Sequence, residues 1–420
     1  MEARYRSTLW ACCFANFFQA VGSCFAILYV PLRGLYGLSF TDFGILVSLN
    51  FITQVASDVL FSKPVEKYGF RPFAVAAPLV SAAGLGLFAA APILFPRRPF
   101  AGFCAGMFLF AAAGGLQELL LSPILDALPI PEERKARSMS MLHSFFAWGQ
   151  IFVVLATTGL LAVWGAARWQ WIVLLWAAPP VAGAVLFCRV PLARQNGGAP
   201  PLPLRALARK GVFYALLAAI VLGGAAEVTM AQWASAFLEK GLRLPKLAGD
   251  VWGVCFFSLM LALGRSGYAA LGARVPLHRL LIGGSGAAAV LYVVCALAQS
   301  PLLGVLACGL TGLCVSLLWP GAIILASRRI PSAGAAMFAL LSAGGDVGAS
   351  LGAFCVGRAA DWAQASGTVF AGAAGESGAL RAGLLLAAVF PLLCCGVHTA
   401  LHCTEARGGL PAGSERRHRQ

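Results

Sequence analysis

One acidic residue, Glu118, stands in the middle of a long apolar stretch of the sequence. Between Phe100 and Leu125 no other charged side chain occurs, and the neighbouring Gln117 adds an amide. An ionised carboxylate accepts hydrogen bonds and a protonated one also donates, so such a group can bind a polar solute or carry a proton. Burial disfavours the charged form of a carboxyl group and so favours proton uptake. We interpret Glu118 as a functional residue.

A third role for Glu118 is structural. Arg265 also lies in an apolar stretch, and a buried acid and base can form a permanent ion pair. At 1.5 Å per residue, Glu118 lies roughly 12 Å from Asp126 at the polar end of its predicted helix, too deep for easy access to the membrane surface. The sequence therefore leaves three interpretations open: Glu118 binds solute, carries a coupling proton, or pairs with Arg265.

Polar residues at helical spacing recur in several other apolar stretches. Residues three and four apart share a helix face, and in lipid a polar face must turn toward protein or water, because a charge at the bilayer centre costs about 2.5–3.5 kcal/mol or more. Hydrogen bonds that merely join helices are the alternative. Because so many stretches carry such a stripe, we favour a shared aqueous cavity. The candidate residues for solute binding or coupling are Asn16, Gln19, Asn50, Gln54, Gln117, Glu118, His143, Gln150, Glu227, Trp233 and Asp346.

The stretch "AAEVTMAQWASAFLEKGL" brings together a carboxylate, an amide and a large ring at Glu227, Gln232 and Trp233. Sugars are bound by polar groups that contact their hydroxyls and by rings that stack on their C–H faces, so this segment has the chemistry that a hexose needs. The alternative for Trp233 is the interfacial aromatic belt, since it lies near the outer end of its predicted span. Trp148 and Trp319 lie deeper and are alternative stacking platforms.

The elements that must position these residues are membrane helices. The chain of 420 residues is 60% hydrophobic and 11% charged, with a mean hydropathy of +0.82, whereas soluble domains average roughly 45–50% and about 25%. A spanning helix needs about 20 apolar residues, whereas a membrane β-barrel shows alternating segments of about 10. We predict an all-α polytopic membrane protein. Its twelve transmembrane helices are expected at about 8–30, 37–61, 72–95, 99–126, 138–164, 167–188, 211–238, 248–271, 278–299, 301–327, 332–358 and 379–402.

The predicted spans form two six-helix pseudo-repeats, 1–188 and 211–402, joined by a basic linker at 189–210 that is rich in Gly and Pro. A basic tail follows at 403–420. "MLHSFFAWGQ" and "MFALLSAGGD" occupy corresponding places in the two halves, and parallel repeats of this kind place a substrate site at their interface. Lys and Arg are concentrated on the side of the linker and tail, so the positive-inside rule makes both termini cytoplasmic.

The formal net charge of +15 is therefore topological, with attraction to anionic lipid, and does not indicate nucleic acid. The 13 cysteines lie almost entirely in apolar segments without a Cys-x-x-Cys pair, so we predict unpaired thiols and no metal site. The sequence has no Gly-x-x-x-x-Gly-Lys-Ser/Thr loop, which argues against an ATP-driven pump. We expect no cofactor, and a proton or sodium ion as the coupling ion.

"SKPVEKYGFRP" resembles the loop Gly-x-x-x-Asp-Arg-x-Gly-Arg-Arg of the major facilitator superfamily. Glu66 and Lys67 stand for its Asp and first Arg, Gly69 and Arg71 match it, and Ser62 replaces its first Gly. The resemblance implies alternating access by rocking of the two halves, and a cytoplasmic gate closed by charge pairs. Plain positive-inside topology is the alternative for these charges. The candidate gate residues are Asp58, Lys63, Glu66, Lys67, Arg71 and Arg265.

"GLQELLLSPI" is similar to a region of the fucose permease and related sugar–proton symporters, where a Glu stands shortly before Asn-Pro. Glu118 stands for that Glu, and Ser122 and Pro123 for the Asn-Pro. The first helix of that subgroup carries an Asp near an Asn, whereas this chain has Asn16 and Gln19. The resemblance therefore implies a sugar substrate more strongly than it implies proton symport.

We predict a secondary active transporter of a small polar solute, a sugar, without catalytic residues. The alternatives are a drug or organic-anion exporter of the same superfamily and, outside it, an intramembrane lipid-modifying enzyme. Such an enzyme needs several His or acidic residues clustered near one interface, whereas among the histidines only His143 lies deep in a span. The expected partners are the solute and membrane lipid, without nucleic acid, and the expected protein is a monomer in a bacterial inner membrane.

Overall fold

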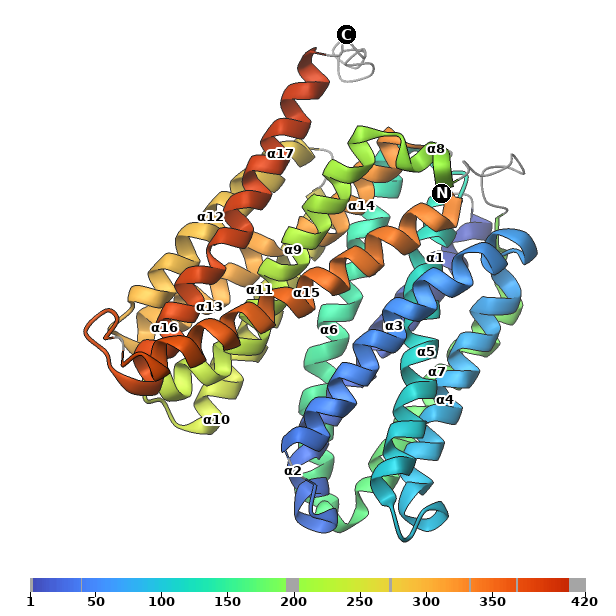
Figure 1. Cartoon of the computed structure of the whole chain (residues 1–420). Coiled ribbons are helices and arrows are strands. Elements are labelled where there is room, and N and C mark those ends of the chain that lie inside the picture. Colours follow the sequence, from blue (N-terminus) through green and yellow to red (C-terminus); the bar gives the residue numbers. More distant parts are fainter. Residues whose placement is uncertain are drawn as a thin grey trace.

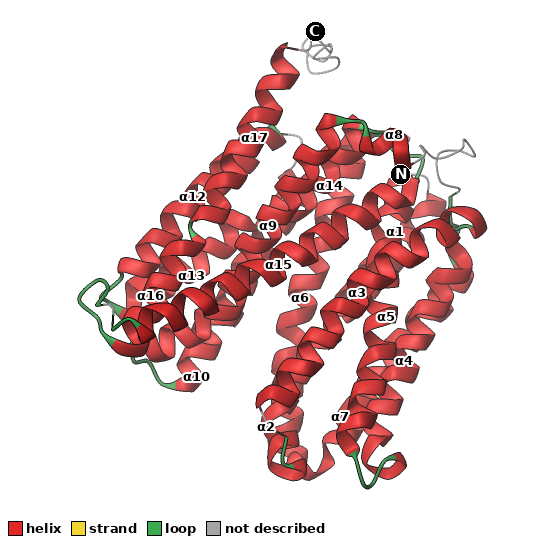
Figure 2. Cartoon of the chain, in the orientation of Figure 1, coloured by secondary structure: helices red, strands yellow, loops and turns green. Residues whose placement is uncertain are grey.

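The computed structural model of the chain describes residues 3–38, 40–193, 204–271, 274–331, 334–367 and 369–407. These residues are almost entirely helical (Figure 2), and their β interaction is one isolated bridge between Phe370 and Ala373. In lipid a helix satisfies its own backbone polar groups, which is why long apolar segments adopt this form. Much of the predicted linker and tail, at 194–203 and 408–420, lies outside the described residues.

The first helices gather in an N-terminal bundle, coloured blue to green in Figure 1. The first span is broken near its middle, because a short 3-10 segment separates α1 from α2. The bounds are α1 Ala3–Gln19, η1 Ala20–Ser23, α2 Cys24–Tyr36, α3 Phe40–Tyr68, α4 Phe70–Leu94, α5 Pro99–Asp126, α6 Glu132–Trp164, η2 Ala166–Arg168 and α7 Trp169–Arg189.

The remaining helices form a C-terminal bundle, coloured green to red in Figure 1, which the short α8 (Leu204–Ala208) precedes. Their bounds are α9 Gly211–Ala236, η4 Phe237–Gly241, α10 Lys246–Gly249, η5 Asp250–Cys255, α11 Phe256–Leu271, α12 Leu277–Leu297, α13 Pro301–Val315, α14 Leu318–Arg329, α15 Gly334–Ala365, α16 Gly375–Ala387 and α17 Val389–Arg407.

Ten helical segments of the described residues are long and apolar enough to cross a membrane. Two further segments complete the twelve predicted spans: the run formed by α1, η1 and α2, and α3, which is 29 residues long but carries the polar stripe of Asn50, Gln54 and Asp58. Several helices extend past the predicted spans, as α6 does by beginning at Glu132 instead of at 138. Its first turn holds Glu132 and Glu133, and negative charge there favours the helix N-terminus.

Small residues bring the site-bearing helices close together. A Cβ atom built on Gly115 of α5 would lie 2.5 Å from the carbonyl oxygen of Gln54 on α3. In the other bundle, a Cβ on Gly224 of α9 would lie 2.5 Å from the carbonyl oxygen of Gly345 on α15. Only glycine permits both approaches, and such close packing is typical of membrane helices.

The two bundles contact each other chiefly through α3 with α15 and α6 with α11. Several of the cross-bundle hydrogen bonds lie toward the end of the molecule where α7 ends and α9 begins, which we term the linker end. There Arg137 donates to the carbonyl oxygens of Ala269 and Ala270 at 2.7 and 2.8 Å, and Ser140 donates to that of Arg265 at 2.7 Å. The start of α1 and the end of α17 lie at this same end (Figure 1).

Candidate functional site: a polar cavity between the bundles

A cavity of about 460 Å³ lies between the bundles and takes its lining from both. It also reaches Leu38 and Leu46 near the start of α3, so it extends away from the linker end. All predicted solute or coupling residues except Trp233 contribute to its lining. The polar lining comprises Asn16, Gln19, Ser23, Asn50, Gln54, Ser81, Gln117, Glu118, Ser122, His143, Gln150, Glu227, Gln232, Arg265 and Asp346.

The wall from the N-terminal bundle is rich in amides that neighbouring helices hold in place. Asn16 donates to the carbonyl oxygen of Leu142 at 2.8 Å, and Gln117 donates to that of Ala15 at 2.9 Å. Gln54 donates to the side chain of Asn50 at 3.3 Å. An amide has two donor hydrogens and an acceptor oxygen, so one such bond orients the group and leaves capacity for a ligand.

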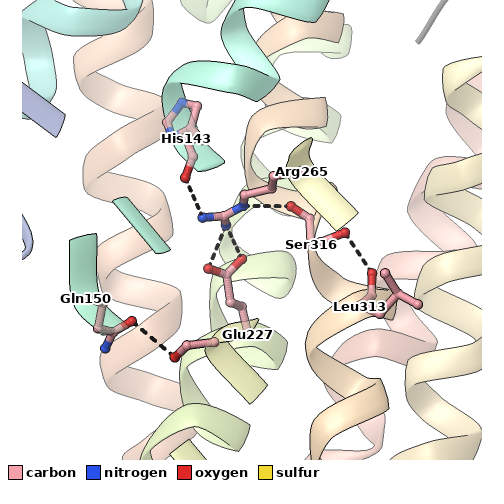
Figure 3. A network of polar contacts seen from close by, with 7 residues as sticks. His143, Gln150, Glu227, Arg265, Leu313 and Ser316 are labelled. Carbon is pink, nitrogen blue, oxygen red and sulfur yellow. Dashed lines mark hydrogen bonds and ion pairs between the residues drawn. The ribbon is translucent and has the colours of Figure 1, made fainter. Parts of the chain in front are cut away.

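On the opposite wall, Arg265 and Glu227 form an ion pair in which one guanidinium nitrogen, Nη2, donates to both carboxylate oxygens at 2.7 Å (Figure 3). The guanidinium also donates to the carbonyl oxygens of Ser316 at 2.9 Å and His143 at 3.2 Å. Arg265 is 3% exposed and Glu227 12%. A buried charge is stabilised only when it is paired and its donors are used, and Arg265 meets both conditions. The bond to His143 reaches across from α11 to α6.

This pairing excludes the structural alternative for Glu118, an ion pair with Arg265. Glu118 is partly buried, and within the described ranges its carboxylate has neither an ion-pair nor a hydrogen-bond partner. Its electrostatic neighbours are instead two other carboxyl groups, those of Asp58 and Asp346. Two of the three interpretations of Glu118 therefore remain, solute binding and proton carriage.

The aromatic assignments need one correction. Trp233 lies outside the cavity lining, and its indole nitrogen donates to the carbonyl oxygen of Ala353 at 3.2 Å, so it packs α9 against α15. Trp319 on α14, the alternative stacking platform, lines the cavity. Trp148 donates to the hydroxyl of Ser266 at 3.1 Å and joins the two bundles.

The predicted gate residues do not act as one set. Glu66 accepts a 3.0 Å hydrogen bond from the backbone N–H of Ala336 in the first turn of α15, where the helix dipole attracts negative charge. Arg71 instead donates to the carbonyl oxygens of Phe187, Cys188 and Val190 at 2.9–3.0 Å, so it caps α7 within its own bundle.

The other gate candidates separate further. Lys63 and Lys67 are exposed, and the Lys67 ammonium lies 5.1 Å from the centre of the Tyr68 ring. Asp58 is fully buried away from them, beside Glu118 and Asp346. Arg265 lines the cavity, and its salt-bridge partner is a residue of its own bundle. Of the predicted set, Glu66 and Arg265 thus have hydrogen bonds across the bundle interface: Glu66 accepts from Ala336, and the backbone carbonyl of Arg265 accepts from Ser140.

Sequence reasoning missed Arg137 and Ser140, which hold the bundles together there. Both donate to backbone carbonyls, and backbone acceptors leave no signal in residue types. The sequence held one weak indication of this role, because Arg137 and Ser140 lie within four residues before "MLHSFFAWGQ", which begins at Met141.

Comparison with known proteins identifies the family to which this chain belongs. The family model for the Major Facilitator Superfamily matches residues 9–353. Compared by sequence alone, the chain has no match among curated proteins.

Among the solved structures that resemble the fold, three transporters show the similarity at low sequence identity. The E. coli fucose:proton symporter FucP is 16% identical with a TM-score of 0.78, covering 94% of this chain and 99% of its own. The proton:xylose symporter XylE is 12% identical with a TM-score of 0.78, covering 95% and 96%. The human organic anion transporter MFSD10 is 14% identical with a TM-score of 0.68, covering 94% and 100%. The all-α fold predicted from the sequence is thereby confirmed, and the chain belongs to the major facilitator superfamily of membrane transporters.

Proposed function

We propose that this transporter moves a small neutral polar solute, a sugar, through the cavity by alternating access and couples that movement to protons. The observation that carries the proposal is the amide-rich lining at the bundle interface, with Asn16, Gln54 and Gln117 oriented by their neighbours. Amides offer a donor and an acceptor side by side, which suits the paired hydroxyls of a sugar. The volume of about 460 Å³ lies within the usual range for small-molecule sites, roughly 300–1,000 Å³.

The charges in the lining favour a neutral solute over an organic anion. The guanidinium of Arg265 is already engaged by Glu227. Glu118 and Asp346 add two carboxyl groups to the lining, and neither has an ion-pair partner in the part of the chain that the structure describes. An anionic solute would lose its hydration and meet these acids, which is unfavourable. The two structurally similar symporters, one for fucose and one for xylose, support the same choice.

Solute binding can be tested by thermal unfolding of the purified protein with sugars, organic acids and cationic drugs. A ligand at 100 times its dissociation constant should stabilise the protein by about 2.7 kcal/mol. We expect a neutral sugar to do so, and Gln54→Ala or Gln117→Ala to abolish the shift. Trp233→Phe is the matched control, because Trp233 lies outside the lining. Stabilisation by organic acids but by no sugar would contradict the substrate class.

We further propose that the linker end faces the cytoplasm, as the distribution of Lys and Arg requires. Two native thiols report on this, because Cys188 and Cys403 are exposed and lie at the linker-end termini of α7 and α17. A membrane-impermeant maleimide should label them in inverted vesicles and not in intact cells. Labelling from outside intact cells would reverse the orientation.

A further inference from the structure

A second group of charged residues lies where α3 and α5 of the N-terminal bundle meet α15 of the C-terminal bundle. It comprises Asp58, Glu118 and Asp346, whose carboxyl groups are electrostatic neighbours. Glu118 and Asp346 line the cavity, whereas Asp58 lies behind them with 0% of its surface exposed. The group therefore joins the cavity to the closed interface between the bundles.

The helix register explains why these three residues meet. Close contact of Gly115 with Gln54 fixes α5 beside α3, and one helical turn further along both helices are Glu118 and Asp58. The hydrogen bond between Glu66 and Ala336 holds α15 against α3, and the two helices run in opposite directions. From this bond, roughly 12 Å along α3 leads to Asp58 and roughly 15 Å along α15 leads to Asp346.

Among the residues that the structure describes, no group near Asp58 neutralises its charge. Both of its carboxylate oxygens, and Oδ2 of Asp346, are buried without a hydrogen-bond partner. The charged groups that face Asp58 from α5 and α15 are both acidic. The Arg71 side chain of α4, which also contacts α3, is directed to the carbonyls at the end of α7.

An isolated buried carboxylate is so costly that such groups take up a proton instead, and two carboxylates that share a site do not both ionise. A metal ion is the other way to neutralise the group. However, the described part of the chain contains no group of three or more His, Cys, Asp or Glu residues arranged to hold one. The ligand that fits this arrangement is a proton.

We propose that Asp58 and Asp346 bind the coupling proton across the bundle interface, and that this proton holds the linker end closed. A proton reaches the pair from the cavity, which Glu118 and Asp346 line. When the bundles separate at the linker end, the two aspartates part and become hydrated, each ionises, and the proton leaves on that side. The proposal rests on the proposed transport function, to which it adds the site of the proton.

The test measures the opening of the linker end without any solute, so it does not depend on the identity of the substrate. Spin labels are placed at Arg134→Cys and Arg279→Cys, exposed positions at the linker end of the two bundles, after Cys188 and Cys403 are changed to serine. Distances are measured in purified protein from acidic to alkaline pH. We expect the otherwise unmodified protein to shift from a short to a longer distance as pH rises, because deprotonation leaves two carboxylates facing each other.

Asp58→Asn together with Asp346→Asn removes both titrating groups and keeps their shape, so the distance should stay short at every pH. The matched control is Asp42→Asn on the far end of the same helix, which should retain the pH response. If the double variant is not recovered in folded form, each single variant should show a weakened response. A pH-independent distance in the unmodified protein, or an unchanged response in the Asn variants, would overturn the proposal. Sugar binding would remain a separate result of the thermal unfolding experiment.

Discussion

The same bundle interface holds two groups of buried charges with opposite surroundings. In one, Arg265 directs its donors to Glu227, to Ser316 and across the interface to His143 (Figure 3). In the other, the charged groups of the described residues that face Asp58 are acidic, and within the same residues neither of its carboxylate oxygens has a hydrogen-bond partner. In the first group the charges of Arg265 and Glu227 cancel, and each guanidinium nitrogen has an acceptor. The second group loses its negative charge only when it binds a cation, such as a proton.

We infer from this difference that the first group stabilises the arrangement of the helices and that the second takes part in transport. A paired charge whose donors are all used stabilises one arrangement of helices, and losing a partner leaves an uncompensated charge behind. An unpaired buried acid is costly in the ionised state, so its protonation depends on whether the interface is closed or hydrated. We therefore expect substitutions in the first group to affect folding, and substitutions in the second to affect coupling.

The largest expected effect is that of Arg265→Met, which leaves Glu227 buried without a counter-charge. Breaking a buried ion pair costs about 3–5 kcal/mol, so this variant should unfold at much lower temperature or fail to accumulate in the membrane. The measurement is thermal unfolding in detergent. The double variant Arg265→Met, Glu227→Leu removes both charges and should recover most of the lost stability. A single variant as stable as the unmodified protein would show that the pair is not structural.

Glu118→Gln should have an intermediate effect that falls on transport. The substitution keeps the shape and mimics the protonated form permanently, and the ionised Glu118 has no partner to lose in the described structure. We expect normal expression and solute counterflow, with loss of uphill accumulation in proteoliposomes. A drop in solute binding by about 1.5–3 kcal/mol, the usual value for a charge-assisted hydrogen bond, would instead assign Glu118 to the solute. Normal accumulation would remove Glu118 from the mechanism.

The smallest effect is expected at Glu66, whose carboxylate accepts one hydrogen bond at the N-terminus of α15. Glu66→Gln removes a charge–dipole interaction worth typically 0.3–1 kcal/mol. The linker end should open modestly more often, which labelling of an introduced linker-end cysteine would report as a small increase in rate. Lys67→Gln is the control, because Lys67 is exposed and lies over the ring of Tyr68. Equal cysteine-labelling rates in the two variants would indicate that Glu66 contributes to membrane topology and not to closure of the linker end.

Hydrophobic run lengths were sufficient to predict the helices, because spanning a bilayer requires an apolar segment of nearly fixed length. The polar stripes predicted the cavity lining for a similar reason, since a polar face in lipid must turn inward. Asn16, Gln54 and Gln117 illustrate this, because each is polar in an apolar stretch and each lines the cavity.

Pairing of the charges could not be predicted in the same way. Glu118 and Glu227 are both acids in apolar helices, and only the packing of α13 against both α9 and α11 decides which of them meets Arg265. Asp58 resembled a gate residue because it precedes Lys63 and Glu66 in sequence, yet it lies about two helical turns deeper than Glu66 and faces another helix. Arg71 and Arg137 bind backbone carbonyls, which no residue pattern reveals.

In the proposed mechanism, the unpaired carboxyl groups of Asp58 and Asp346 carry a proton together with the solute. The most direct measurement uses proteoliposomes in weak buffer without an ion gradient, to which the sugar that stabilises the purified protein is added outside. We predict that the external medium becomes more alkaline as sugar enters, and that Asp58→Asn with Asp346→Asn abolishes this change while counterflow continues. Sugar entry without any proton movement in the unmodified protein would contradict the account.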